Sequence, residues 1–202
     1  ELQARIWFTL GALIVYRLGT HIPIPGVDPN QYALAYGSAS QGILGLWNTF
    51  SGGAVERMAI FALNVMPYIS ASIIIQIMST AIPALERLKK EGEVGRKQIN
   101  QYTRYLTVVL AVAQAFGVSV ALSAIDPTSG QSMALEPGLY FMFSTIITLV
   151  GGTVFLLWLG EQITARGVGN GISLIIFAGI LAELPRWIFN TFGQLRENQM
   201  SI

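Results

Sequence analysis

Two polar side chains lie in the middle of a long apolar stretch, where they could line a water-filled path. Ser72 and Gln76 interrupt the uncharged run 58–85. At 3.6 residues per helical turn they share a face with Val65 and Ile69, so this face is branched and apolar at one end and polar at the other. Buried polar groups need partners or water. The face therefore predicts either a funnel that narrows to a hydrophobic collar or hydrogen bonds to a neighbouring helix. The residues alone leave both interpretations open.

A glycine-rich segment is the second pattern with possible chemistry. Gly167, Gly169 and Gly171 alternate with other residues, as glycines do in some phosphate-binding loops. No Lys-Ser/Thr pair follows them and no strand is expected before them, so a nucleotide site is not predicted. We expect these glycines instead to let the backbone approach another helix closely, or to leave a helix start recessed in a membrane. Ile172 and Ile176 follow as a branched pair at i, i+4 spacing.

The side chains that usually perform catalysis are sparse. His21 is the single histidine, it stands beside a proline turn, and the chain has no cysteine. Asp28 and Asp126 both fall outside the long apolar stretches, so no aspartate pair is expected within a membrane. No His-Glu-x-x-His metal motif occurs, and a net charge of +1 gives no indication of nucleic-acid binding. We therefore expect no enzymatic activity, metal site or cofactor.

Long uncharged stretches must position these residues. Hydrophobic residues make up 52% of the 202-residue chain and charged residues 11%, whereas soluble domains carry roughly 25% charged residues. A helix needs about 20 apolar residues to cross a hydrocarbon core of about 30 Å. Arg17, at the end of the first apolar stretch, should reach a water interface. We predict an all-α polytopic membrane protein with about five transmembrane helices, near residues 4–20, 57–84, 104–125, 137–160 and 170–192.

Basic residues concentrate in one connection, near residues 86–103, whereas the next connection, 126–136, holds none. The positive-inside tendency places the first connection in the cytoplasm, and with it the N-terminus and the loop near 161–171. The basic connection is either a solvated loop that fixes the topology or, in addition, a docking surface for a cytoplasmic partner. Its basic residues are Arg87, Lys89, Lys90, Arg96, Lys97 and Arg104.

A short apolar segment near residues 42–54 lies between the first two crossings. It is too short to span a bilayer and too apolar to be left in water. It is therefore either an interfacial amphipathic helix or a re-entrant helix that plugs a cavity, and Gly52 and Gly53 are expected to end it. Its apolar positions at helical spacing are Ile43, Leu46, Trp47 and Phe50.

Several classes of protein fit these features to different degrees. A water-filled channel would use the graded face and the plug-like segment. A coupled small-solute transporter generally needs an ionisable residue at mid-membrane, and the three central stretches contain none. A structural scaffold leaves the graded face unexplained. The chain lacks an initiator methionine, and we expect it to be a piece of a longer protein that folds poorly without the remainder.

Five collinear motifs resemble the N-terminal half of the SecY family of protein-conducting channels. They are PIPGVD (23–28), FSGGA (50–54), IFALNVMPYISASIIIQ (60–76), KKEGEVGRKQINQYTRY (89–105) and GEQITARGVGNGIS (160–173). The resemblance implies an hourglass channel made of two inverted five-helix halves, of which this chain supplies one. It also implies passive conduction of unfolded secretory polypeptides through the bacterial cytoplasmic membrane, with signal sequences and membrane helices released sideways into lipid.

The resemblance assigns roles to individual residues. It implies that Val65, Ile69, Ile172 and Ile176 form a constriction and that the segment near 42–54 is the plug. Ser70 would face a lateral gate, and Ser72 and Gln76 would line the funnel. The implied partners are SecE, SecG, the SecA ATPase or a ribosome at the basic connection, signal-sequence-bearing polypeptides, lipid, and the C-terminal half of the same protein.

Two residues depart from the pattern of the family. Val65 stands where isoleucine is usual, which predicts a slightly wider collar. Asn64 stands where glycine is common, and we expect its polar side chain to ease hydration of the collar.

Overall fold

The computed structural model describes residues 1–124 and 130–197, and its regular structure in these ranges is helical. The all-α prediction is confirmed, since the described residues form no strand and only two isolated β-bridges. Asp126 and the predicted end of the third crossing at 125 lie outside the described residues. The helices of the described ranges are α1 (Leu2–Gly19), α2 (Pro29–Ala39), α3 (Ile43–Phe50), α4 (Met66–Ala81), α5 (Pro83–Lys90), α6 (Glu93–Ser123), α7 (Leu139–Arg166) and α8 (Gly171–Arg196).

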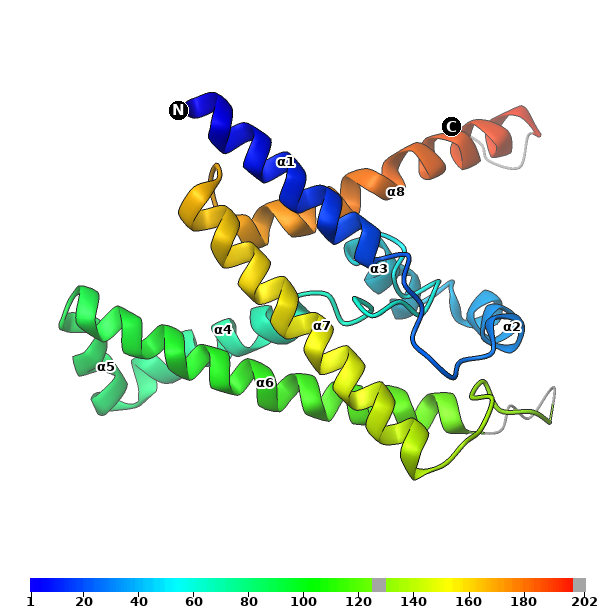
Figure 1. Ribbon diagram of the computed structural model, residues 1–202, viewed down its shortest axis with the longest axis horizontal. Coiled ribbons are helices and arrows are strands. Elements are labelled where there is room, and N and C mark those ends of the chain that lie inside the picture. The colour runs from blue at the N-terminus through cyan, green and yellow to red at the C-terminus, as the bar shows by residue number, and fades with distance from the viewer. Residues whose placement is uncertain (125–129, 198–202) are drawn as a thin grey trace.

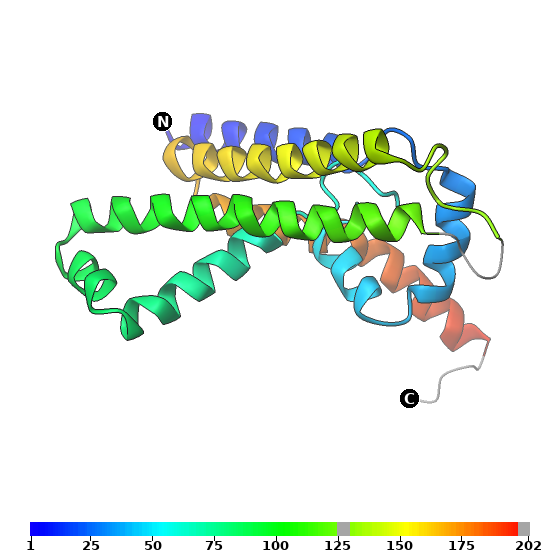
Figure 2. The ribbon, with the colours of Figure 1, turned by 90° about the horizontal axis from the view of Figure 1, so that it is seen from below.

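The long helices are arranged in layers around α6. In Figure 2, α1 and α7 lie side by side on one side of α6, and α4 and α5 lie on the other. The buried residues of α4 and α6 recur every four positions and are mostly small, which lets the two helices pack closely. These residues are Pro67, Ala71, Ile75 and Ser79 of α4 and Thr103, Thr107, Ala111, Ala115 and Ser119 of α6.

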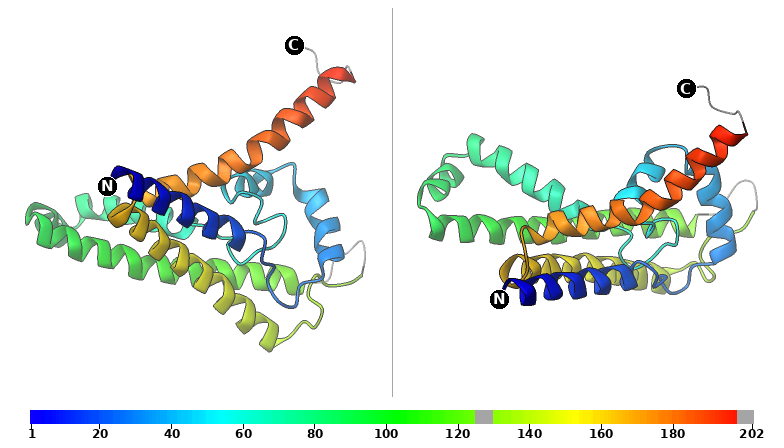
Figure 3. Two further views of the ribbon diagram at one scale, coloured as in Figure 1. Left: turned by 45° about the horizontal axis from the view of Figure 1, so that its top comes forward. Right: turned by 90° about the horizontal axis from the view of Figure 1, so that it is seen from above.

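The connections between helices gather at two ends of the molecule. The N-terminus, α5 and the turn between α7 and α8 lie at one end (Figure 1), and α2 and the chain that follows α6 lie at the other. The two further views agree with this arrangement (Figure 3). The segments predicted to share the cytoplasmic side thus share one end of the fold. Which end faces the cytoplasm stays a prediction.

Three helices, α6, α7 and α8, are long and apolar enough to cross a membrane by length and composition. A fourth candidate is the pair α4 and α5, which pass this criterion together but are bent by 101° at the break between them. At about 1.5 Å per residue, the 16 residues of α4 extend only about 24 Å, less than a hydrocarbon core. The predicted count of five crossings stays a prediction.

In the predicted crossing near 57–84, the first helical residue is Met66, and after Ala81 the chain breaks at Ile82 before α5 begins. Residues 51–65 instead form a buried run of turns, in which Met58 (φ 46°) and Asn64 (φ 52°) adopt left-handed backbone conformations. Left-handed residues interrupt an α-helix, so α4 cannot begin earlier than this run allows. At the other end, Pro83 ends α4, because the residue before a proline avoids the helical region.

Two segments between the predicted crossings are helical. The basic connection near 86–103 is not a loop: it is made of α5 and the first turns of α6, which meet at Gly92 (φ 79°). The second is α2, in the polar stretch after Asp28. The Asp28 carboxylate caps this helix by accepting hydrogen bonds from the backbone N–H of Asn30 (2.9 Å) and of Gln31 (3.3 Å). Asp-Pro is a common start of a helix and was the signal available in the sequence.

Candidate functional site

The four predicted collar residues lie in one hydrophobic cluster. Val65, the residue that precedes α4, is fully buried in it. Ile69 in α4 and Ile172 and Ile176 in α8 are half-buried and pack against the same cluster. The fold therefore brings together residues from two distant segments, as a collar requires. The other buried members are Ala12, Tyr16, Ala54, Ala59, Phe61, Leu156, Leu159, Ile163 and Ile175.

The start of α8 is positioned by a very close contact with α7. A Cβ atom added to Gly171 would lie 1.8 Å from the carbonyl oxygen of Gly160, so only glycine fits there. Asn170 caps the helix, and its Oδ1 accepts hydrogen bonds from the backbone N–H of Ile172 (3.1 Å) and Ser173 (3.2 Å). The prediction that the glycine-rich segment serves a close backbone approach is confirmed at Gly171.

The graded face of α4 is more exposed toward the α5 end. Ser70 and Ser72 are half-buried, and Gln76 is exposed. In the described ranges, neither Ser72 nor Gln76 makes a side-chain hydrogen bond to a neighbouring helix. The polar contact nearest to them is local, from the Ser79 hydroxyl to the backbone carbonyl of Gln76 (2.7 Å). In the described ranges, the polar side chains of this face therefore do not serve to hydrogen-bond a neighbouring helix.

The predicted plug segment forms a short helix, α3, which ends at Phe50 before two left-handed glycines, Gly52 (φ 67°) and Gly53 (φ 86°). The prediction that these glycines end the helix is confirmed. Ile43, Leu46 and Phe50 are exposed, whereas Trp47 is half-buried and its indole N–H donates to the carbonyl of Ala62 (3.1 Å). One side of α3 is thus held against the segment 51–65 through Trp47, and the other side exposes apolar side chains.

The end of α3 is held by a set of side-chain donors. The last carbonyl groups of a helix lack partners within the helix and carry a partial negative charge, so they attract such donors. Two of the donors here are guanidinium groups, which bind the same carbonyl. The hydrogen bonds run from Asn64 Nδ2 to the Phe50 carbonyl (2.7 Å), from Tyr16 Oη to that of Ser51 (3.2 Å), and from Arg17 Nη1 and Arg57 Nη2 (3.1 Å) to that of Gly52.

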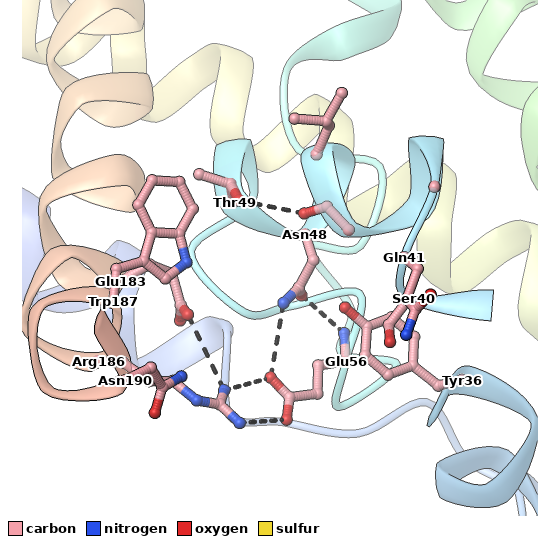
Figure 4. Close-up of a pocket in the computed structure, with 13 residues that line it drawn as sticks. Tyr36, Ser40, Gln41, Asn48, Thr49, Glu56, Glu183, Arg186, Trp187 and Asn190 are labelled. Carbon is pink, nitrogen blue, oxygen red and sulfur yellow. Dashed lines mark hydrogen bonds and ion pairs between the residues drawn. The ribbon is translucent and has the colours of Figure 1, made fainter. Parts of the chain in front are cut away.

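A cavity of about 740 Å³ lies between α3 and α8, and an ion pair borders it (Figure 4). Arg186 of α8 binds Glu56 with both terminal nitrogens, at 2.6 Å and 3.0 Å. The hydrogen bond from Arg186 holds the pKa of the Glu56 carboxyl below its usual value of 4.5. Asn48 of α3 accepts a hydrogen bond from the Glu56 backbone N–H (2.8 Å). The buried carboxylate of Glu183 lies 3.9 Å from Arg186. These contacts connect the plug segment to α8.

The basic residues of the predicted docking surface are all exposed at one end of the fold. Arg87, Lys89 and Lys90 lie on α5, and Arg96, Lys97 and Arg104 lie on α6. Two of them form ion pairs, Lys90 with Glu86 (2.7 Å) and Arg104 with Glu161 of α7 (2.6 Å). The others extend from a helical hairpin, which is a more rigid platform than a loop.

Several residues at the end of α3 were not found by the sequence reasoning. Arg17 was expected to reach water, but its guanidinium binds the Gly52 carbonyl. The expectation that Asn64 hydrates the collar is wrong in its premise, because Asn64 is only 1% exposed and bonds to α3. The available signal was charge: Arg17 and Arg57 flank apolar stretches, but no pattern in the sequence pairs them with the end of α3.

Comparison with known proteins relates this fold to protein translocases. A match to the SecY family covers residues 59–202. The protein translocase subunit SecY of Pseudomonas aeruginosa is 54% identical over 202 residues, which are 100% of this chain and 44% of that protein. The subunit of Escherichia coli strain K12 is 50% identical over 200 residues, which are 99% of this chain and 45% of that protein.

Two solved structures share the fold. One, described as the structure of a protein conducting channel, has a TM-score of 0.66 at 18% identity and covers 98% of this chain and 42% of that chain. The other, Sec61 in the canine ribosome-channel complex from the endoplasmic reticulum, has a TM-score of 0.65 at 18% identity with the same two coverages.

The fold and the site define an all-helical membrane protein built like one half of a protein-conducting channel. The chain belongs to the SecY family. It spans less than half the length of the curated relatives named above.

Proposed function

We propose that this chain forms one half of a channel that passes unfolded polypeptides across the bacterial cytoplasmic membrane. One observation carries the proposal: Val65 is buried in a single cluster against which Ile69, Ile172 and Ile176 all pack, beside a short helix anchored by its carbonyl end. A narrow ring of branched apolar side chains disfavours a continuous column of water, yet such side chains can yield to a passing chain.

The remaining roles follow from this arrangement. The exposed apolar side of α3 fills the external cavity of the resting channel and meets the C-terminal half of the protein. Ser72 and Gln76 line the funnel on the other side of the collar, and Ser70 faces a lateral gate through which signal sequences and membrane helices leave for lipid. The N-terminus lies in the cytoplasm.

The channel is passive and has no catalytic activity of its own. Its partners in the membrane are SecE and SecG, and a cytoplasmic partner, SecA or a ribosome, binds the hairpin of α5 and α6. The support for this docking is the row of exposed basic residues at the end of the fold that also holds the N-terminus. The relative described as a ribosome-channel complex is consistent with a ribosome as partner.

Site-specific photocrosslinking tests the proposed path. A photoreactive residue replaces Ile69 in the full-length parent protein, and a secretory precursor is stalled in the complex. The control probe replaces Ile147 of α7, which is 69% exposed and lies opposite the buried face formed by Thr145 and Leu149. We expect Ile69 to crosslink to the precursor only when its signal sequence is intact, and Ile147 to crosslink to lipid.

Two crosslinking outcomes would refute the proposed polypeptide path. If the precursor is shown to be stalled but never crosslinks at Ile69, or crosslinks equally at Ile147, the collar is not the path. The cluster around Val65 would then be ordinary helix packing.

A further inference from the structure

Asn64 links the predicted collar to the predicted plug segment. Its Nδ2 donates to the carbonyl of Phe50, the last residue of α3, at 2.7 Å. The next residue in the chain is Val65, a predicted collar residue that directly precedes α4 as its N-cap. Of the side chains that hold the end of α3, Asn64 is the one that is adjacent in sequence to the collar.

The backbone around Asn64 is fixed, so its side chain has a defined direction. The residue is left-handed (φ 52°), a conformation that asparagine tolerates better than most residues with a side chain. Its N–H donates to the Phe61 carbonyl (2.9 Å), and the Val65 carbonyl accepts from the N–H of Ile69 (3.0 Å). Asn64 is therefore held between a turn and the first turn of α4.

The Asn64 amide is only partly satisfied. It is 1% exposed, and its Oδ1 is buried and accepts no hydrogen bond from the described residues. Burying such a group costs free energy, which the single bond to Phe50 only partly offsets. A buried polar group of this kind is more often retained for a role than for stability.

We propose that Asn64 is a latch that ties the position of the plug to the width of the collar. The inference rests on the proposed function and assigns a positioning role to one side chain of it. A polypeptide that pushes Val65 and Ile69 outward displaces the start of α4. Because Asn64 precedes that start directly, the bond to Phe50 breaks, and α3 leaves its site more easily because one of the four side chains that hold its end has let go. When the collar closes, the bond forms again.

The latch and the hydration of the collar by Asn64 predict opposite changes in the resting ion leak of the Asn64→Gly variant. If Asn64 wetted the collar, Asn64→Gly would lower the ion leak of the resting channel. If Asn64 holds the plug, the same change raises the leak. Glycine adopts the left-handed conformation without strain, so Asn64→Gly removes the amide and leaves the backbone intact. Asn64→Asp keeps the shape of the side chain but removes the donor, because a carboxylate only accepts.

Thiol labelling of the plug tests the latch in the full-length parent protein. Ser51 is fully buried beside the latch, so Ser51→Cys reports release of α3 by its rate of reaction with a membrane-impermeant maleimide. This reporter is combined with Asn64→Gly, with Asn64→Asp, and with the matched control Asn30→Gly on α2. Loss of one hydrogen bond changes an equilibrium by about two- to tenfold, and the labelling rate should rise by that factor in both Asn64 variants. The resting ion conductance in planar bilayers should rise with it, and Asn30→Gly should change neither.

The latch is overturned if labelling in either Asn64 variant stays at the parental rate, or if Asn64→Gly lowers the conductance. Labelling reports the docking of α3 and needs no translocating chain. Failure of the precursor to crosslink at Ile69 would therefore refute the polypeptide path, whereas parental labelling would refute only the role of Asn64 in holding α3, so the two failures can be told apart.

Discussion

Two adjacent glycines in the middle of α7 provide a matched test of how the buried segment 51–65 is held. A Cβ atom added to Gly152 would lie 2.2 Å from the carbonyl oxygen of Ile60 and 3.2 Å from the Phe61 ring. A Cβ added to Gly151 would meet nothing within 4 Å. Gly152→Ala should therefore push residues 51–65 away from α7, and Gly151→Ala should not.

The expected difference between the two variants can be worked out. Alanine is favoured over glycine in a helix by roughly 0.5–1 kcal/mol, and this gain is common to both. The contact with Ile60 must open by about 1 Å, and overpacking of this kind costs about 1–3 kcal/mol. Because the helix term cancels, Gly152→Ala should be less stable than Gly151→Ala by about 1–3 kcal/mol. This difference corresponds to about 5- to 150-fold in the unfolding equilibrium constant.

Unfolding of the full-length parent in mild detergent, titrated with a denaturing detergent and followed by tryptophan fluorescence, measures this difference. We expect Gly151→Ala to unfold at or slightly above the parental midpoint and Gly152→Ala clearly below it. Equal midpoints for the two variants would refute the reasoning, because they would mean that Ile60 does not lie against α7.

Two further predictions concern the contacts around α8. Glu56→Gln should lower the midpoint of thermal unfolding at pH 7, because it removes the ion pair with Arg186. Arg186 lowers the pKa of the Glu56 carboxyl, so the ion pair stabilises the fold fully above pH 4.5 and is lost as the pH falls through the lowered pKa. The difference in midpoint between the variant and the parent should therefore shrink below pH 4.5. A midpoint difference that is constant between pH 7 and pH 3 would contradict this. Asn170→Ala should destabilise the protein by about 1 kcal/mol in the same unfolding titration and Asn170→Asp by much less, because only the aspartate still accepts from Ile172 and Ser173; equal losses in both variants would show that the cap does not matter.

Much of this protein is determined by local sequence. The uncharged runs predict α6, α7 and α8 because any backbone in hydrocarbon must satisfy its hydrogen bonds within a helix. The end of α3 at Gly52 and Gly53 follows from the conformational freedom of glycine. The predicted collar residues were chosen from helical spacing and family resemblance together.

Other features depend on contacts between distant segments, which no local pattern encodes. Residues 57–65 were predicted to start an apolar helix, yet they form turns, because their amide and carbonyl groups find partners at Ile22 and Ile24 and within the turn segment itself. The sequence predicted that Arg17 lies near a water interface, and it gave no sign that the guanidinium would bind the Gly52 carbonyl just after the negative end of α3.

Asn64 shows most clearly what the sequence alone could not predict. The sequence placed a polar residue beside the collar and suggested that it wets the collar. Only the tertiary structure brings the end of α3 to that residue, and a buried amide beside an unpaired carbonyl forms a hydrogen bond in preference to facing a pore. Which residues are apolar or charged is local information, but which donor meets which carbonyl is decided by how the helices pack.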